Sequence, residues 1–245
     1  MRRRFFVDRF ASNSAFLHGD SASHLGRVLR AKRGQLYELS DGERVWLAKI
    51  ERIALAKRGA SGIEFSLVEP LPATAPRLHI DLFLAIVKFD RFEWCLEKAT
   101  ELGATNITPL AAARTDKPLL AAARNRQERW KRILLESAQQ ARRLKPAALH
   151  ELATPRTALL QSREGLKIVL SESRDSPSLR GVLKNSKSGV SSAALAIGPE
   201  GGWTADEISA ARSAGFVEAS LGENILRTET AVLAALAIVR FALGD

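Results

Sequence analysis

From residue 77 to the end of the chain, short apolar runs alternate with amphipathic stretches, and this alternation restricts the fold more than any other feature. The runs have the length of buried strands, and the stretches between them have the residue spacing of helices. Strands that alternate with helices favour a mainly parallel sheet covered by helices. The sequence therefore predicts an α/β domain over residues 77–245.

Apolar spacing and helix-end residues predict where these elements begin and end. A capping box formed by Thr204 and Glu207 opens one helix, and Gly103 and Gly215 each end a helix. The last helix is apolar on almost every side, so we expect it to be buried. The predicted strands are 79–87, 106–109, 166–171, 193–197 and 216–221, and the predicted helices are 91–102, 127–144, 205–214 and 229–243.

Three prolines within residues 70–76 mark a boundary, because proline resists both helices and central strands. A short helix is expected before this boundary, at residues 24–30. The strand-like runs before the boundary are 35–39, 44–53 and 62–68. We expect a small, β-rich, barrel-like domain over residues 1–70 and a linker over residues 71–76.

Composition narrows the class of protein. The chain has 245 residues, and its hydrophobic content of 46% is enough to bury the cores of one or two domains. Its longest apolar run, 231–239, is too short to span a bilayer, and residues 1–8 lack the apolar segment of a secretion signal. Cys95 is the only cysteine, which excludes an internal disulfide and a multi-cysteine zinc site. We expect a cytoplasmic, metal-free protein.

The formal net charge of +10 is unevenly distributed along the chain. Residues 113–146 contain ten Lys or Arg and three Asp or Glu, a net charge of +7, whereas residues 193–245 contain three Arg and seven Asp or Glu, a net charge of −4. The basic part favours a polyanion partner such as RNA or DNA, bound largely through phosphate contacts. A solvated helix end is the alternative for the basic residues 139–143.

Residues 197–202 read Ile-Gly-Pro-Glu-Gly-Gly and include the end of a predicted strand. The three glycines let a ligand approach the main chain at positions where a side chain would clash. Pro199 has no N–H group and Glu200 adds a negative charge, so the turn favours a neutral or cationic ligand over a phosphate. The alternative is a tight turn that merely requires glycine.

A second turn, Leu-Gly-Glu-Asn at residues 221–224, ends another predicted strand and leads into Leu-Arg-Thr-Glu-Thr at residues 226–230. Both turns lie at the carboxyl ends of predicted strands, where open α/β sheets bind ligands. Thr228 also suits a helix N-cap, and Arg227 either pairs with a neighbouring glutamate or points at a substrate. Neither turn has the glycine spacing of a dinucleotide-binding or P-loop site.

Two further stretches complete a recognisable set: His-Leu-Gly-Arg-Val-Leu-Arg at residues 24–30 and Glu-Leu-Gly-Ala-Thr-Asn-Ile-Thr-Pro-Leu at residues 101–110. With the two turns, this set closely resembles the bacterial 16S ribosomal RNA uridine-N3 methyltransferase family, of the SPOUT or α/β-knot class, over essentially the whole chain. The resemblance implies an N-terminal PUA-like RNA-binding β-barrel and a C-terminal domain tied in a trefoil knot. It also implies a homodimer that uses S-adenosyl-L-methionine to methylate N3 of a uridine in 16S rRNA of the small ribosomal subunit.

The resemblance also implies roles for individual residues. For catalysis we expect Arg227 to stabilise the uridine anion, with Arg143 or Arg114 as alternates, and Glu229 to accept the N3 proton. The implied cofactor-binding residues are Leu170, Ser171, Glu172, Ile197, Gly198, Pro199, Glu200, Gly201, Gly202, Leu221, Gly222, Ile225, Leu226, Arg227, Thr228 and Thr230. The implied RNA-binding residues are Arg2, Arg3, Arg4, Arg27, Arg30, Lys32, Arg114, Arg142 and Arg143.

The chain departs from the family at two positions. The family usually has Glu where this chain has Gln139, and it tends to have an acidic residue where this chain has Ala113. The stretch from Gln139 to Pro146 is also about one residue shorter than the corresponding stretch in the family. Two alternatives to this function stay open, namely a SPOUT methyltransferase with another RNA target and a non-catalytic RNA-binding or ribosome-assembly protein. A third, an ordinary nucleotide-binding α/β enzyme, would bind phosphate at the glycine turns, which Pro199 and Glu200 oppose.

Overall fold

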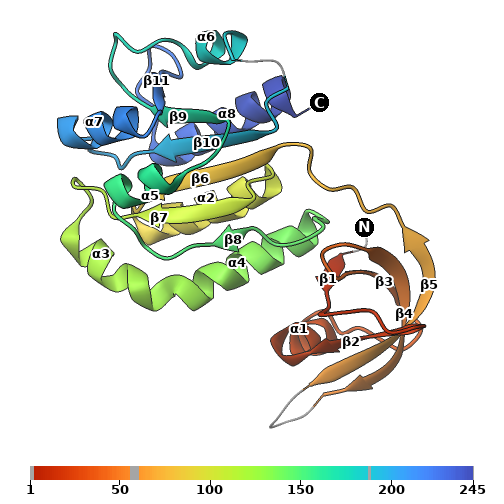
Figure 1. The fold of residues 1–245 in the computed structure, drawn as a ribbon. Helices are drawn as coiled ribbons and strands as arrows, with labels where there is room; N and C mark the ends of the chain where they lie inside the picture. Colours follow the sequence, from red (N-terminus) through yellow and green to blue (C-terminus); the bar gives the residue numbers. More distant parts are fainter. Residues whose placement is uncertain (1–2, 56–60, 187–188, 245) are drawn as a thin grey trace. The chain divides into compact units, whose positions relative to one another are not determined.

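The structure of the protein is a computed structural model that forms two compact units (Figure 1). The residues that it describes are 3–55, 61–186 and 189–244. The first unit combines Met1–Ala75 with Ala138–Pro146, and the second combines Pro76–Ser137 with Ala147–Asp245. No described helix is both long and apolar enough to cross a membrane. The first unit thus includes residues 138–146 from the middle of the chain. The prolines at residues 70–76 predict a boundary but not this inclusion.

The first unit is built on a curled five-stranded sheet in the order β1-β3-β4-β5-β2. β1 pairs with β3 in parallel, and the other pairs are antiparallel. The bounds are β1 (Arg4–Phe6), β2 (Ser14–His18), β3 (Leu36–Ser40), β4 (Val45–Ala54) and β5 (Gly62–Leu71). Among the described residues no pairing joins β1 to β2, so the sheet is an open half-barrel.

The three strands predicted in this part of the chain are confirmed as β3, β4 and β5, whereas β1 and β2 were not predicted. β1 is only three residues long and follows a run of arginines, so it has no apolar pattern of its own. The helix predicted at 24–30 is present as a π-helical turn at His24–Val28, and α1 (Gly19–Ser23), which directly precedes it, was not predicted. Phe5, Leu25 and Phe65 are among the side chains of the core.

Residues 138–146 are bound to the first unit through Glu38 of β3, whose side chain is buried. Arg4 Nη2 lies 2.9 Å from the Glu38 carboxylate, and the Arg142 guanidinium forms a second ion pair with it. Ser40 Oγ donates a hydrogen bond of 2.6 Å to the Leu144 carbonyl. These contacts hold residues 142–144 in a non-helical conformation against β3.

Helix α4 (Gln127–Gln140) therefore ends four residues earlier than the predicted end at residue 144. Arg142 has a φ of 53°, in the left-handed region, and the Arg143 N–H donates to the Ala138 carbonyl at 3.0 Å. This is the hydrogen-bond pattern that commonly terminates helices at a glycine. Here the ion pair with Glu38 accompanies a conformation that costs energy for a residue other than glycine.

The second unit is an α/β domain, as predicted. Its six strands follow the order β11-β9-β10-β6-β7-β8, and all pairs are parallel. The strands are β6 (His79–Ala85), β7 (Asn106–Leu110), β8 (Ala148–Leu149), β9 (Leu166–Leu170), β10 (Ser192–Ile197) and β11 (Val217–Ala219). The helices are α2 (Phe89–Glu101), α3 (Lys117–Ala123), α4, α5 (Pro155–Gln161), α6 (Leu179–Lys184), α7 (Ala205–Ser213) and α8 (Thr228–Leu243).

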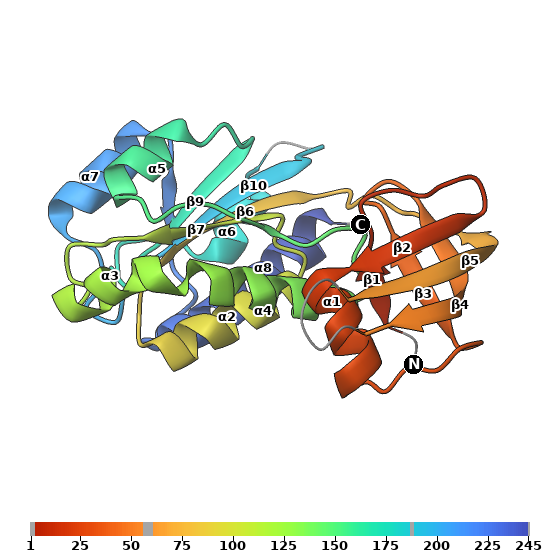
Figure 2. The same ribbon diagram turned by 90° about the horizontal axis from the view of Figure 1, so that it is seen from below.

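Helices cover both faces of this sheet (Figure 2). Leu82 and Leu84 of β6 belong to a core that also includes apolar residues of α2, α4, α6 and α8. Phe83 and Ala85, which alternate with them, belong to the opposite core, formed with α5 and α7. A strand that is apolar on both faces reads as one continuous apolar run, which is the pattern from which β6 was predicted.

The last helix, α8, differs from its prediction on one face. Val232, Leu236 and Val239 are buried as expected, but Ile238 is 40% exposed and Phe241 is 84% exposed. The expectation that α8 is buried therefore holds for one face only: the face with Ile238 and Phe241 is open in the single chain. The trefoil knot itself stays a prediction.

Candidate active site

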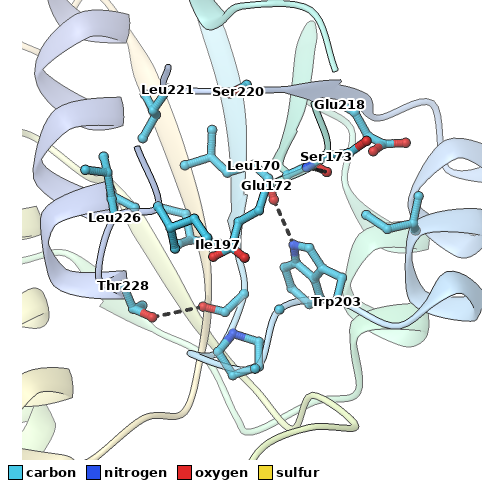
Figure 3. Close-up of a pocket in the computed structure, with 18 of the residues that line it drawn as sticks. Leu170, Glu172, Ser173, Ile197, Trp203, Glu218, Ser220, Leu221, Leu226 and Thr228 are labelled. Atoms are coloured by element: carbon cyan, nitrogen blue, oxygen red, sulfur yellow. Dashed lines mark hydrogen bonds between the residues drawn. The ribbon is translucent and has the colours of Figure 1, made fainter. Parts of the chain in front are cut away.

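A cavity of about 530 Å³ opens at the carboxyl ends of β9, β10 and β11, which are neighbours in the sheet (Figure 3). Parallel α/β sheets bind their ligands at this edge, because loops from several strands meet there. Three segments form most of its wall, namely residues 170–173, 197–205 and 218–226. Arg114, Ile208, Arg212, Thr228 and Ala231 complete the lining.

The predicted cofactor residues gather at this cavity. All of them line it except Arg227 and Thr230, which are exposed at the start of α8. Arg227 occupies the N-cap position of α8, where it makes no capping hydrogen bond with its side chain. The proposed N-cap role of Thr228 is therefore wrong by one residue, and Thr228 Oγ1 instead donates to the Gly198 carbonyl at 3.3 Å.

Sequence reasoning missed Trp203, which forms one wall of the cavity (Figure 3). Its Nε1 donates a hydrogen bond of 2.9 Å to the Leu170 carbonyl at the end of β9. Its ring lies so close to Gly198 that an added Cβ would come within 3.0 Å of the indole. Gly198 is therefore needed for packing against Trp203, as well as for any approach of a ligand to the main chain.

Arg114 also packs against the glycine turn. Its Nη1 donates to the Gly201 carbonyl at 2.7 Å, and a Cβ at Gly201 would meet the Arg114 side chain at 3.2 Å. The neighbouring Ala113 N–H donates to Glu207 Oε1 at 2.8 Å, while Glu207 also forms the predicted capping box of α7. An acidic side chain from α7 thus lies beside position 113, where the chain itself has alanine.

Four carboxylates line the cavity: Glu172, Glu200, Glu218 and Glu223. Two of them are paired, because Arg212 Nε donates to Glu218 at 2.7 Å and Arg91 Nη1 donates to Glu200 at 3.1 Å. Glu172 points into the space between Leu226 and Trp203, and it has no hydrogen-bond or ion-pair partner among the described residues (Figure 3). The cavity therefore suits a ligand that carries positive charge.

The predicted catalytic groups do not meet at the cavity. Glu229 is not among the lining residues, and its Oε2 is buried without a hydrogen-bond partner in the described part of the chain. Burial and the negative charge of Glu229 together raise the pKa of the Cys95 thiol to about 12. Of the three candidate cations, Arg114 lines the cavity, whereas Arg227 does not and Arg143 belongs to the first unit.

The expected RNA-binding residues differ in their exposure and in their ion pairs. Arg3, Arg27, Arg30 and Lys32 are exposed, and Arg2 lies outside the described residues. Arg4 is buried and its guanidinium is bound to Glu38 and to the Arg142 carbonyl, so we correct the expectation that Arg4 holds a phosphate. Arg142 is partly exposed but is ion-paired with the same carboxylate.

Comparisons with known proteins agree with this geometry. A family model described as an RNA methyltransferase domain matches residues 74–240. The chain is 37% identical over 221 residues to the ribosomal RNA small subunit methyltransferase E of Synechocystis sp., which covers 87% of this chain and 68% of the relative. It is 30% identical over 236 residues to the protein of the same name from Bacillus subtilis, covering 91% of this chain and 88% of that one.

A solved structure resembles the whole chain. The ribosomal RNA small subunit methyltransferase E from Neisseria gonorrhoeae bound to S-adenosyl methionine matches with a TM-score of 0.85 and 29% identity, covering 100% of this chain and 99% of that chain. The parallel sheet and the family match define an RNA methyltransferase of the SPOUT class. More closely, the chain belongs to the ribosomal RNA small subunit methyltransferase E family. The resemblance inferred from the four sequence stretches is confirmed.

Proposed function

We propose that this protein transfers the methyl group of S-adenosylmethionine to N3 of a uridine in 16S ribosomal RNA, on the assembled small subunit. The observation that carries the proposal is the acidic cavity at the ends of β9, β10 and β11, lined by most of the residues expected to bind the cofactor. The Neisseria relative, whose fold matches over the whole chain, is a complex with this cofactor.

The chemistry of the lining fits the cofactor. S-adenosylmethionine has a positively charged sulphur and an ammonium group, and we assign Glu172 to attract this positive charge. The wall also offers apolar side chains, Leu221 and Leu226, on which the adenine ring can pack. Main-chain groups of the glycine turn remain for hydrogen bonds to the adenine edge.

When bound, the cofactor supplies an electrophilic methyl group. Uridine N3 must lose its proton to solvent water, since Glu229 does not line the cavity, and then form a bond to the methyl carbon, while the electron pair of the breaking carbon–sulphur bond stays on sulphur. A cation beside O2 or O4 stabilises the anionic base, as an oxyanion site does. We assign this role to Arg114, because it lines the cavity and Arg227 does not. The base must also leave its pair, since pairing hides N3.

Calorimetric titration with S-adenosylmethionine tests the cofactor assignment. The Glu172→Gln variant should bind about tenfold more weakly than the unaltered protein, because it loses a charge-assisted contact. Glu64→Gln is the matched control, since Glu64 belongs to the sheet of the first unit. Equal affinities of both variants would remove Glu172 from the cofactor site.

Turnover measurements test the catalytic assignment. With cofactor and RNA at saturation, Arg114→Ala should lower kcat by about a hundredfold, the size of effect seen when one donor to a developing anion is removed. Arg227→Ala is the control, because Arg227 is exposed outside the cavity. The reverse result, with turnover lost only in Arg227→Ala, would refute our choice of Arg114.

We also propose that the protein is a homodimer that works in the cytoplasm, where small subunits are assembled. The apolar outer face of α8, which includes Ile238 and Phe241, supports a protein–protein contact, because large exposed apolar side chains in a cluster mark interaction surfaces. The partner that we propose for it is a second copy of the same chain.

For the first unit we propose RNA binding, with residues 1–70 as its main domain. The exposed cations Arg3, Arg27, Arg30 and Lys32 support phosphate contacts. Arg143 belongs to the same unit through residues 138–146 and stays a candidate for RNA contact.

A further inference from the structure

Arg91, a residue of α2 to which neither the sequence nor the family match assigns a role, lies between two acidic side chains from distant segments. Its Nη1 donates a hydrogen bond of 3.1 Å to Glu200 Oε1, and its Nε lies 3.8 Å from Glu229 Oε1. The Arg91 and Glu229 side chains are only 29% and 18% exposed, so solvent screens their attraction less than it screens a surface pair. The Arg91 guanidinium thus forms ion pairs with two carboxylates.

The two carboxylates belong to two neighbouring segments that both contribute residues to the cavity wall. Glu200 is in the glycine turn after β10, and Glu229 is in the first turn of α8, directly after Thr228. A second link joins the same segments, because Thr228 Oγ1 donates to the Gly198 carbonyl at 3.3 Å. Arg91 therefore joins the same two segments of the cavity wall that the Thr228–Gly198 hydrogen bond joins.

The contact between the glycine turn and the start of α8 depends on the positive charge of Arg91. Without the guanidinium, Glu200 and Glu229 would be two negative groups near a turn that already lines an acidic cavity. Glu229 could not easily be solvated, since its Oε2 is buried and has no hydrogen-bond partner among the described residues. Charges left unpaired in a partly buried place are costly, so the turn and the start of α8 would move apart.

We infer that Arg91 is a positioning residue for the cofactor: it holds the glycine turn against the start of α8 and so keeps the two walls of the cavity at their working separation. This inference rests on the proposed function, because it takes S-adenosylmethionine as the ligand. It also assigns a different role to Glu200, which acts through Arg91 rather than as a direct contact for the cofactor ammonium.

The test compares Arg91→Ala, Arg91→Lys and Arg129→Ala, with S-adenosylmethionine as the titrant in calorimetry and no RNA present. Arg129 of α4 is the matched control, because it forms an ion pair of 2.8 Å with Glu93 of α2, the helix that carries Arg91, and neither Arg129 nor Glu93 lines the cavity. We expect Arg91→Ala to raise the Kd for the cofactor about fivefold, Arg91→Lys to restore part of the loss, and Arg129→Ala to change nothing.

Kinetics and thermal unfolding separate positioning from general stability. Arg91→Ala should raise KM for the cofactor and leave kcat within about twofold at saturating cofactor. If Arg91→Ala and Arg129→Ala lower Tm equally and neither changes Kd, Arg91 is merely structural and the inference is overturned. Failure of the unaltered protein to bind the cofactor would instead refute the proposed function.

A double-mutant cycle with Glu200→Gln keeps the inference testable if Arg91→Ala folds poorly. In the Arg91→Lys background, Glu200→Gln should raise Kd by a smaller factor than it does in the unaltered protein, because the two residues act through one contact. Equal factors in both backgrounds would show that Glu200 and Arg91 act independently, and would overturn the inference.

Discussion

At the scale of single residues, the pKa of the Cys95 thiol on α2 depends on the packing of α2 against α8. Its side chain is buried, and burial together with the Glu229 charge raises the pKa of the thiol to about 12, from an ordinary value of 9.0. A raised pKa means that the folded protein keeps the proton more tightly than the unfolded chain does. The stabilisation that follows is complete below pH 9 and is lost as the pH rises towards 12.

We therefore predict that the stability advantage of the unaltered protein over Cys95→Ala shrinks between pH 9 and pH 12. Urea unfolding at a series of pH values measures both free energies of unfolding. Below pH 9 their difference should stay constant, since the thiol is protonated in both states. A difference that does not change up to pH 12 would contradict the effect of Glu229 and burial on Cys95.

The sequence predicted individual residues of the cavity lining where the local pattern was sufficient. Gly198 and Leu221 could be found because each stands where a predicted strand passes into a turn. Trp203 and Glu218 could not, because their positions at the cavity depend on the order of strands in the sheet. That order places β11 beside β9 rather than beside β10, and nothing in the spacing of apolar residues encodes it.

At the scale of elements, the early end of α4 shows a tertiary contact overriding a local preference. The pattern of residues 127–144 is helical throughout, yet the chain leaves the helix after Gln140 because Glu38 binds Arg142 and Ser40 binds the Leu144 carbonyl. Long-range ion pairs of this kind leave no trace in the sequence spacing. The capping box at Thr204, by contrast, is local and was predicted correctly.

We predict that Glu38→Gln lowers the free energy of unfolding by about 3 kcal/mol, because it leaves the buried Arg4 without its countercharge. Glu64→Gln is the matched control on the same sheet, and it should cost less than about 1 kcal/mol, since its ion pair with Arg52 is largely exposed. Urea unfolding of both variants measures the difference. Similar losses in the two variants would show that the Glu38 ion pairs contribute no more than a surface pair.

At the scale of the whole molecule, the pattern of alternating strands and helices was enough to predict the α/β sheet of the second unit. It was not enough to predict that residues 138–146 belong with the first unit, because unit membership follows from contacts between residues about a hundred positions apart. The exposed face of α8 was missed for a related reason. An apolar helix predicts burial, but the sequence alone does not say whether its own chain or a second copy buries it.

We predict that Phe241→Glu converts the protein from a dimer to a monomer, because it places a charge in the proposed contact between two copies of α8. Light scattering coupled to gel filtration gives the molar mass directly. Val217→Glu is the control, since Val217 is also exposed, at 46%, but lies on β11 at the edge of the sheet. A monomeric unaltered protein, or a dimer that survives Phe241→Glu, would contradict the α8 contact.

The most direct test of the central proposal is to incubate the protein with labelled S-adenosylmethionine and either small ribosomal subunits or naked 16S RNA, and then to map the modified base. We predict that the label is incorporated into the subunits, as a methyl group on N3 of one uridine of 16S RNA. A label on another atom or on transfer RNA, or cofactor binding without any transfer, would contradict it.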